Sequence, residues 1–122
     1  MMELRYPTLS EAIQRIVGKP LLSVNFVEDY VQFVWEGSFF TAYTMPKVVQ
    51  DGIEYGCERP EYRDAIYSLE GRVLGSVDVF PGDRVELNFT NSVLVKVSLQ
   101  DADYVGPEAI QFGGEDGPLW VV

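Results

Sequence analysis

Several short stretches of this chain alternate hydrophobic and polar residues with a period of two, which is typical of half-buried β-strands. The alternation is strictest at residues 30–36 and 84–90, where every second side chain from Val31 and from Val85 is hydrophobic. Turn-forming residues such as Pro81-Gly82 separate the stretches. The pattern predicts six strands in two runs of three, at residues 21–27, 30–36 and 39–45 and at residues 73–80, 84–90 and 93–99.

Two other segments follow a helical period. Residues 9–17 and 62–70 place hydrophobic side chains at i, i+3, i+4 and i+7, so that they form one stripe along a helix. Gly18 and Gly71 follow directly and end the predicted helices. Helices of two to three turns are marginal alone, so both are expected to pack against the strands.

The two sets of elements form a repeat. Residues 7–45 and 60–99 share the order helix, glycine and three strands, with an offset of 53 residues that becomes 54 near Pro81-Gly82. Two copies are too few for a solenoid, which needs at least three. We therefore expect residues 1–122 to form a single domain with an approximate internal two-fold, a less regular linker at 46–59, and a tail with a last strand at 100–122.

The fold class that follows is α+β. We expect internally duplicated α-β-β-β units with about six or seven mostly antiparallel strands in one curved sheet or half-barrel, covered on one face by two short helices. Hairpin loops of three residues, 36–38 and 90–92, keep the hydrophobic side chains of successive strands on one face, because a one-residue slip would turn them over. In this register Trp35 faces Phe39, and Phe89 faces Val93.

Composition narrows the possible environments and partners. The chain has 122 residues, of which 47% are hydrophobic, and a net charge of −10 without any histidine. Such a charge repels nucleic acids and anionic lipids, so neither is an expected partner. The chain shows no signal-peptide pattern and no apolar run of about 18 residues that could span a membrane. With Cys57 as its one cysteine, it is expected to be cytoplasmic.

Most devices of catalysis are missing from the sequence. Without histidine there is no Ser-His or Cys-His pair, and Cys57 has only Arg59 nearby in sequence to activate it. Asp101, Asp103 and Glu108 superficially resemble a calcium loop but lack its third closely spaced acid and its turn glycine. We therefore expect no cofactor, no metal and no enzymatic activity.

The outward-facing positions differ between the two copies. The second copy carries polar and charged residues there, whereas the first copy has Tyr30, Val34, Phe40 and Ala42. A hydrophobic outer face needs a cover, which could be the linker, the tail, a partner or a second copy of the chain. The candidate interface therefore consists of these four residues and the acidic residues Asp101, Asp103 and Glu108 of the tail.

Residues 62–77, with Leu69-Glu-Gly71, and residues 82–99, with Phe89-Thr-Asn-Ser92, form a pattern similar to one in small uncharacterised bacterial proteins with a domain of unknown function. There, a helix ends in Leu-x-Gly, a hydrophobic strand follows, and a hairpin carries Phe-x-Asn-Gly-x-x-Leu. Ser92 stands here where that pattern has glycine. Some of these proteins look like immunity proteins of toxin systems. The resemblance covers about a third of the chain and brings no catalytic residues.

These observations favour a non-enzymatic protein that binds another protein, with an acidic surface that complements a basic partner as in immunity-like inhibitors. One alternative is a structural homodimer that uses the same outer face. A less favoured alternative is a small-ligand-binding protein, or an enzyme that uses only carboxylates, inside the curved sheet.

Overall fold

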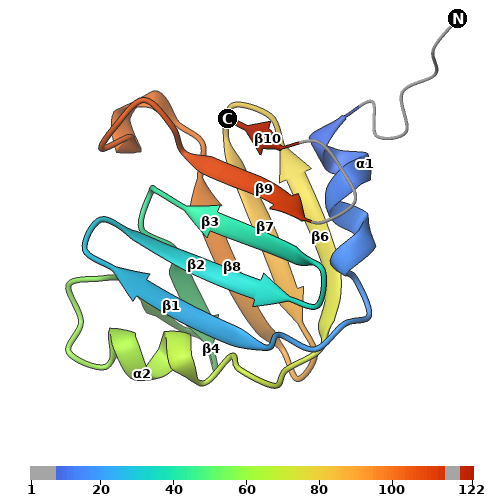
Figure 1. Cartoon of the computed structure of the whole chain (residues 1–122). Coiled ribbons are helices and arrows are strands. Elements are labelled where there is room, and N and C mark those ends of the chain that lie inside the picture. Colours follow the sequence, from blue (N-terminus) through green and yellow to red (C-terminus); the bar gives the residue numbers. More distant parts are fainter. Residues whose placement is uncertain (1–7, 115–118) are drawn as a thin grey trace, which may run out of the picture.

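The computed structural model describes residues 8–114 and 119–122. The first residue of the repeat, Pro7, lies outside the described residues. Two five-stranded antiparallel sheets face one another, and their strands run in clearly different directions (Figure 1). The α+β class and the antiparallel pairing are confirmed, but the strands form two sheets where one curved sheet was expected.

The first sheet has the order β1-β2-β3-β9-β10. Its strands are β1 (Ser23–Val27), β2 (Tyr30–Trp35), β3 (Ser38–Ala42), β9 (Ile110–Gly114) and β10 (Trp120–Val121). The second sheet has the order β5-β4-β8-β7-β6. Its strands are β4 (Lys47–Gln50), β5 (Ile53–Tyr55), β6 (Leu74–Phe80), β7 (Arg84–Phe89) and β8 (Val93–Ser98).

Each sheet consists of three consecutive strands and a hairpin from elsewhere in the chain. The β4–β5 hairpin, which was expected to be an irregular linker, joins β8 of the second sheet. The β9–β10 hairpin, most of which was expected to be loop, joins β3 of the first sheet. Linker and tail therefore extend the sheets instead of covering an outer face.

The hydrophobic core lies between the inner faces of the sheets. As predicted, Val31, Phe33 and Trp35 on β2 are buried, and so are the alternating residues of β7 and β8. Ile110 and Phe112 on β9 are also fully buried, with Gln111 between them pointing outward. This inward packing explains why β9 forms a strand beside β3.

The short helices pack at different places on the two sheets, not together on one face (Figure 1). Helix α1 (Leu9–Ile13), continued by the 3-10 turn η1 (Gln14–Ile16), contacts β6. Helix α2 (Tyr62–Tyr67) contacts β1 and β4. The predicted stripes face the core, since Ala12, Ile13 and Ile66 are buried.

The segments that follow the two helices bind each other reciprocally. The amide of Gly18 donates to the carbonyl of Leu74 at 2.8 Å, and the amide of Gly71 donates to the carbonyl of Leu21 at 2.7 Å. Gly18 and Gly71 both have a positive φ, 87° and 88°, so the chain turns sharply at corresponding points after the two helical segments, although α2 itself already ends at Tyr67. The hydrogen bonds join the two halves of the chain at corresponding positions.

Candidate binding surface around the loop of residues 100–109

The loop between β8 and β9 projects from one end of the molecule (Figure 1). It begins with a 3-10 turn, η2 (Asp101–Asp103), and the hydroxyl of Ser98 donates to the carboxylate of Asp103 at 2.5 Å. At the other end of the loop, the amide of Tyr43 donates to the carbonyl of Ala109 at 2.8 Å. The loop is thus held at both ends, while Val105 between them is 77% exposed.

A hollow of about 420 Å³ lies on one side of this loop, and we call it the tyrosine pocket. Its lining residues are Asp29, Tyr30, Tyr43, Val105, Gly106, Pro107 and Glu108. Tyr30 begins β2 and Tyr43 follows β3, so the antiparallel pairing of these strands places them side by side. Their ring centroids are 5.3 Å apart with an interplanar angle of 61°, which is an edge-to-face contact.

The charge of the tyrosine pocket is negative. Asp29 and Glu108 line it, and no lysine or arginine is among its lining residues. Burial raises the pKa of Tyr43, and the neighbouring Glu108 and Tyr30 raise it further, so the phenol stays neutral at physiological pH. The amide nitrogen of Gln111 donates to the carboxylate of Glu108 at 3.2 Å and holds it beside the loop. The pocket therefore combines two aromatic rings with two carboxylates, and none of its lining residues is a cation.

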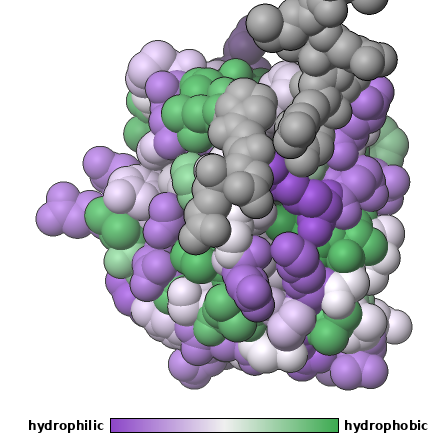
Figure 2. All heavy atoms as spheres, turned by 45° about the vertical axis from the view of Figure 1, so that its right-hand side comes forward, coloured by the Kyte–Doolittle hydropathy of each residue, from purple (hydrophilic) through white to green (hydrophobic). Residues whose placement is uncertain are grey.

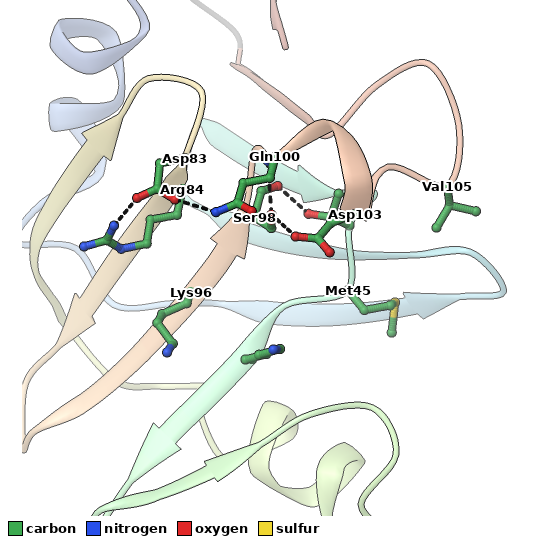
Figure 3. A pocket seen from close by; sticks show the side chains of 10 residues that line it. Met45, Asp83, Arg84, Lys96, Ser98, Gln100, Asp103 and Val105 are labelled. Atoms are coloured by element: carbon green, nitrogen blue, oxygen red, sulfur yellow. Dashed lines mark hydrogen bonds and ion pairs between the residues drawn. The ribbon is translucent and has the colours of Figure 1, made fainter.

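Val105 also lines a second hollow of about 420 Å³, which we call the charged pocket. Figure 3 shows Asp83, Arg84, Ser98, Gln100 and Asp103 along one side of it and Lys96 across from them.

The charges of this pocket are largely paired. The ammonium of Lys96 lies 2.6 Å from the carboxylate of Glu54, and Arg84 forms ion pairs with Asp83 and Glu86. A hydrogen bond from Gln100 and the ion pair with Arg84 lower the pKa of Asp83, which keeps this carboxylate ionised. The charged pocket thus satisfies most of its own charges.

The structure brings some of the predicted interface residues together. Tyr30 and Glu108, which are far apart in the sequence, both line the tyrosine pocket. Asp103 lines the charged pocket, and Asp101 is exposed at the start of η2. Val34 is partly buried and sits on the outer face of β2, away from the pocket.

The prediction that Phe40 and Ala42 face outward is wrong, because both are fully buried. Phe40 faces Phe33 across the β2–β3 pair, and Trp35 faces Ser38. The β2–β3 loop therefore has two residues, Glu36 and Gly37, where three were expected. Gly37 has φ of 75°, a conformation that glycine adopts without steric cost and that permits this tighter turn.

The shorter loop moves β3 by one residue and turns its side chains over. Phe39 now lies on the outer face, and Tyr43, which the sequence pattern did not indicate, becomes part of the tyrosine pocket. The dipeptide Glu36-Gly37 was the signal that could have revealed it, because glycine is common in two-residue hairpin turns. In the second sheet the three-residue loop is confirmed, since Phe89 faces Val93.

A further hollow of about 540 Å³ lies beside α2 and includes the exposed Cys57. The hydroxyl of Tyr62 donates to the carbonyl of Pro46 at 2.5 Å, and burial raises the pKa of this phenol. Arg63 lies over the ring of Phe26, 4.6 Å from its centroid. These contacts tie α2 to the strands.

Among residues 8–114 and 119–122, no three His, Cys, Asp or Glu side chains are grouped so that they could hold a metal ion. The same residues include no helix that is long and hydrophobic enough to cross a membrane. Figure 2 shows the side of the molecule near α1, where hydrophobic residues appear as separate groups among hydrophilic ones. This side thus offers no broad hydrophobic surface outside the atoms drawn in grey.

Comparisons of this chain with protein-family models, with curated proteins and with solved structures found no match. Functional interpretation therefore depends on the surface itself. Its two distinguishing features are the negative, partly aromatic tyrosine pocket and the exposed Val105 beside it.

Proposed function

We propose that this protein is a non-enzymatic binding domain that recognises a basic partner protein through the tyrosine pocket and the acidic loop beside it. A cytoplasmic inhibitor of the immunity type, with a basic toxin as its partner, is the role that the sequence resemblance favours. The observation that carries the proposal is the meeting of Asp29 and Tyr30 with Glu108 in one hollow, although Glu108 comes from a distant part of the sequence.

The distribution of charge supports a basic partner. The chain has a net charge of −10, and no lysine or arginine follows Lys96. The loop of residues 100–109 therefore contributes Asp101, Asp103 and Glu108 without any compensating cation of its own. A concentrated negative region of this kind steers a positively charged protein during encounter and accelerates association, most strongly at low salt.

The surface also has the composition of a protein interface. Tyrosines are enriched at the centres of interfaces because they combine a large apolar ring with a polar hydroxyl. Tyr30 and Tyr43 form such a centre, Val105 adds exposed hydrophobic area, and carboxylates surround them. An apolar centre inside a charged rim is the arrangement in which a few residues supply most of the binding energy.

The test is quantitative capture of proteins from the native cell lysate by the wild-type chain and by two charge-reversed variants. The first variant is Asp29→Lys/Glu108→Lys. The control, Glu11→Lys/Asp78→Lys, makes the same charge change at exposed residues on α1 and β6. We expect a basic protein that is captured by the wild type and the control but lost with the first variant. Equal capture by the wild type and both variants would exclude this surface as the binding site.

A second candidate function, self-association, is favoured by one observation. The five strands of the first sheet contain no charged residue, whereas β4 to β8 contain both lysines and carboxylates. On the outer face of the first sheet, Gln32 accepts a hydrogen bond from Asn25 at 3.5 Å and donates one to Thr41 at 3.4 Å. Two copies, each with a net charge of −10, would repel least if these uncharged faces met.

Solution mass by light scattering separates the two candidates. A homodimer that is weakened by Gln32→Lys, a substitution that introduces charge on this face, would support self-association. A wild-type monomer at low and at high salt would exclude it and leave recognition of a foreign partner.

We further infer that the two halves of the chain arose by duplication. The reciprocal hydrogen bonds between residues 18–21 and residues 71–74 support this, because each bond has a counterpart 53 residues away. The second half would then retain the residues that the tyrosine pocket has exchanged for others. The β6–β7 turn carries Asp83-Arg84 where the β1–β2 turn carries Asp29-Tyr30.

A further inference from the structure

We infer that the tyrosine pocket takes up the cationic end of one arginine or lysine side chain of the partner. The inference rests on the proposed function and names the chemical group that the pocket would recognise. A hollow of about 420 Å³ is of the size of small-ligand pockets, roughly 300–1,000 Å³, and is large enough for a single long side chain.

The rings provide the first component of such a site. A cation is attracted to the face of a tyrosine ring when it lies within about 6 Å of the centroid. The edge-to-face contact between Tyr30 and Tyr43, at 61°, turns the two rings in different directions. Both rings remain only partly buried, so an entering side chain can reach them from solvent.

The carboxylates provide the second component. Asp29 reaches the pocket from the β1–β2 turn, and Glu108 reaches it from the loop before β9. Hydrogen bonds between a guanidinium or ammonium group and a carboxylate are about twice as strong as those between neutral groups. Glu108 is partly buried and already oriented by Gln111, which reduces the ordering that binding would require.

The corresponding turn of the second sheet shows how this protein fills a similar arrangement. At the β6–β7 turn, Arg84 pairs with the adjacent carboxylate of Asp83 and lies over the ring of Phe80, 4.1 Å from its centroid. At the β1–β2 turn the acid is retained as Asp29, but Tyr30 stands where Arg84 stands. The β6–β7 turn thus carries its own cation, Arg84, whereas no cation of the chain lines the tyrosine pocket at the β1–β2 turn.

Arginines also lie over other aromatic rings in the described part of the chain. Arg15 lies over Phe112 at 5.0 Å, and Arg59 lies over Tyr55 at 5.5 Å. Four of the five arginines of residues 8–114 therefore lie over rings elsewhere, and no arginine or lysine lines the tyrosine pocket, which leaves it to a cation from outside. The charged pocket is a weaker candidate site because its cations already have carboxylate partners.

The experiment is an NMR titration of the full chain, in about 150 mM salt, with three probes. These are Nα-acetyl-arginine N-methylamide, the corresponding lysine compound and the corresponding citrulline compound, which is nearly isosteric with arginine but neutral. We expect saturable shifts at Tyr30, Tyr43 and Glu108 with either cationic probe, and at least about tenfold weaker binding of the citrulline compound. Equal binding of the neutral compound, or cation-induced shifts spread over all acidic residues, would overturn the inference.

Two conservative variants keep the test independent of folding. Glu108→Gln and Asp29→Asn remove one charge each from residues that are not in the core, and each is expected to weaken the cationic probes by about three- to tenfold. Glu11→Gln on α1 is the matched control and should leave binding unchanged. Unchanged affinity in both pocket variants would count against the pocket as the site.

The outcomes separate this inference from the proposed function. Loss of partner capture by Asp29→Lys/Glu108→Lys, together with no local binding of the cationic probes, would refute the side-chain pocket and leave the binding surface intact. Local binding of the probes without any captured basic protein would support the pocket and refute the proposed partner class.

Discussion

Replacing Phe40 by alanine is expected to destabilise the domain by about 3–5 kcal/mol, the range observed when a buried phenylalanine is truncated. Phe40 is fully buried, and its ring lies 6.3 Å from that of Phe33 across the β2–β3 pair. Phe39, its neighbour on the outer face, is only partly buried. The same substitution there should cost about 1–2 kcal/mol, because it removes apolar contacts without opening a cavity in the core.

The assay is urea and thermal denaturation of Phe40→Ala, Phe39→Ala and the wild type, followed by circular dichroism and tryptophan fluorescence. For a domain of this size each kcal/mol corresponds to a shift of about 4 °C in melting temperature, so Phe40→Ala should melt about 12–20 °C below the wild type. Superimposable transitions by the two probes would justify a two-state treatment.

The comparison of the two variants tests the hairpin register. With the three-residue loop that the sequence pattern predicts, Phe39 would be the core residue and Phe40 the exposed one. A larger loss for Phe39→Ala than for Phe40→Ala would therefore refute the two-residue turn at Glu36-Gly37. It would also move Tyr43 away from the outer face and remove the tyrosine pocket.

Two other predictions concern the turn and the charged pocket. Gly37→Ala should destabilise the domain by about 1 kcal/mol, because its φ of 75° is unfavourable for alanine although no atom lies within 4 Å of the added Cβ. Gly106→Ala is the control, because its φ is outside the left-handed range and the space around it is open, so this substitution should be neutral or stabilising. Thermal denaturation measures both variants. An equal loss of stability in Gly37→Ala and Gly106→Ala would contradict the turn geometry. Lys96→Gln should cost a few tenths of a kcal/mol near pH 7. The hydrogen bond from Lys96 lowers the pKa of Glu54 below its ordinary value of 4.5, so this contribution is present above pH 4.5 and is lost as the pH falls through the lowered pKa. A difference between Lys96→Gln and wild type that persisted at pH 2 in urea titrations would contradict this pairing.

The candidate site was predictable in part. The sequence alone indicated Tyr30 as an interface residue and Asp103 and Glu108 as its charged companions, from the contrast between the two copies and the lack of basic residues in the tail. It could not show that Tyr30 and Glu108 share a hollow, because that depends on β9 pairing with β3. It placed Phe40 and Ala42 in the interface because one residue of loop length decides which face a strand presents.

Local pattern determined many elements of this protein: the two short helices, the glycines that turn the chain after them, and the six alternating strands whose inner residues form much of the core. These features depend on interactions between neighbours in sequence, namely periodicity, capping and turn conformation. Tertiary structure alone decided that the strands divide into two sheets and that the linker and tail complete them. It also decided that a turn of β1–β2 meets a loop some 75 residues later to form the tyrosine pocket. The reason is physical: strand partners are chosen by burial of hydrophobic faces against distant segments, and no local pattern specifies which distant segment that will be.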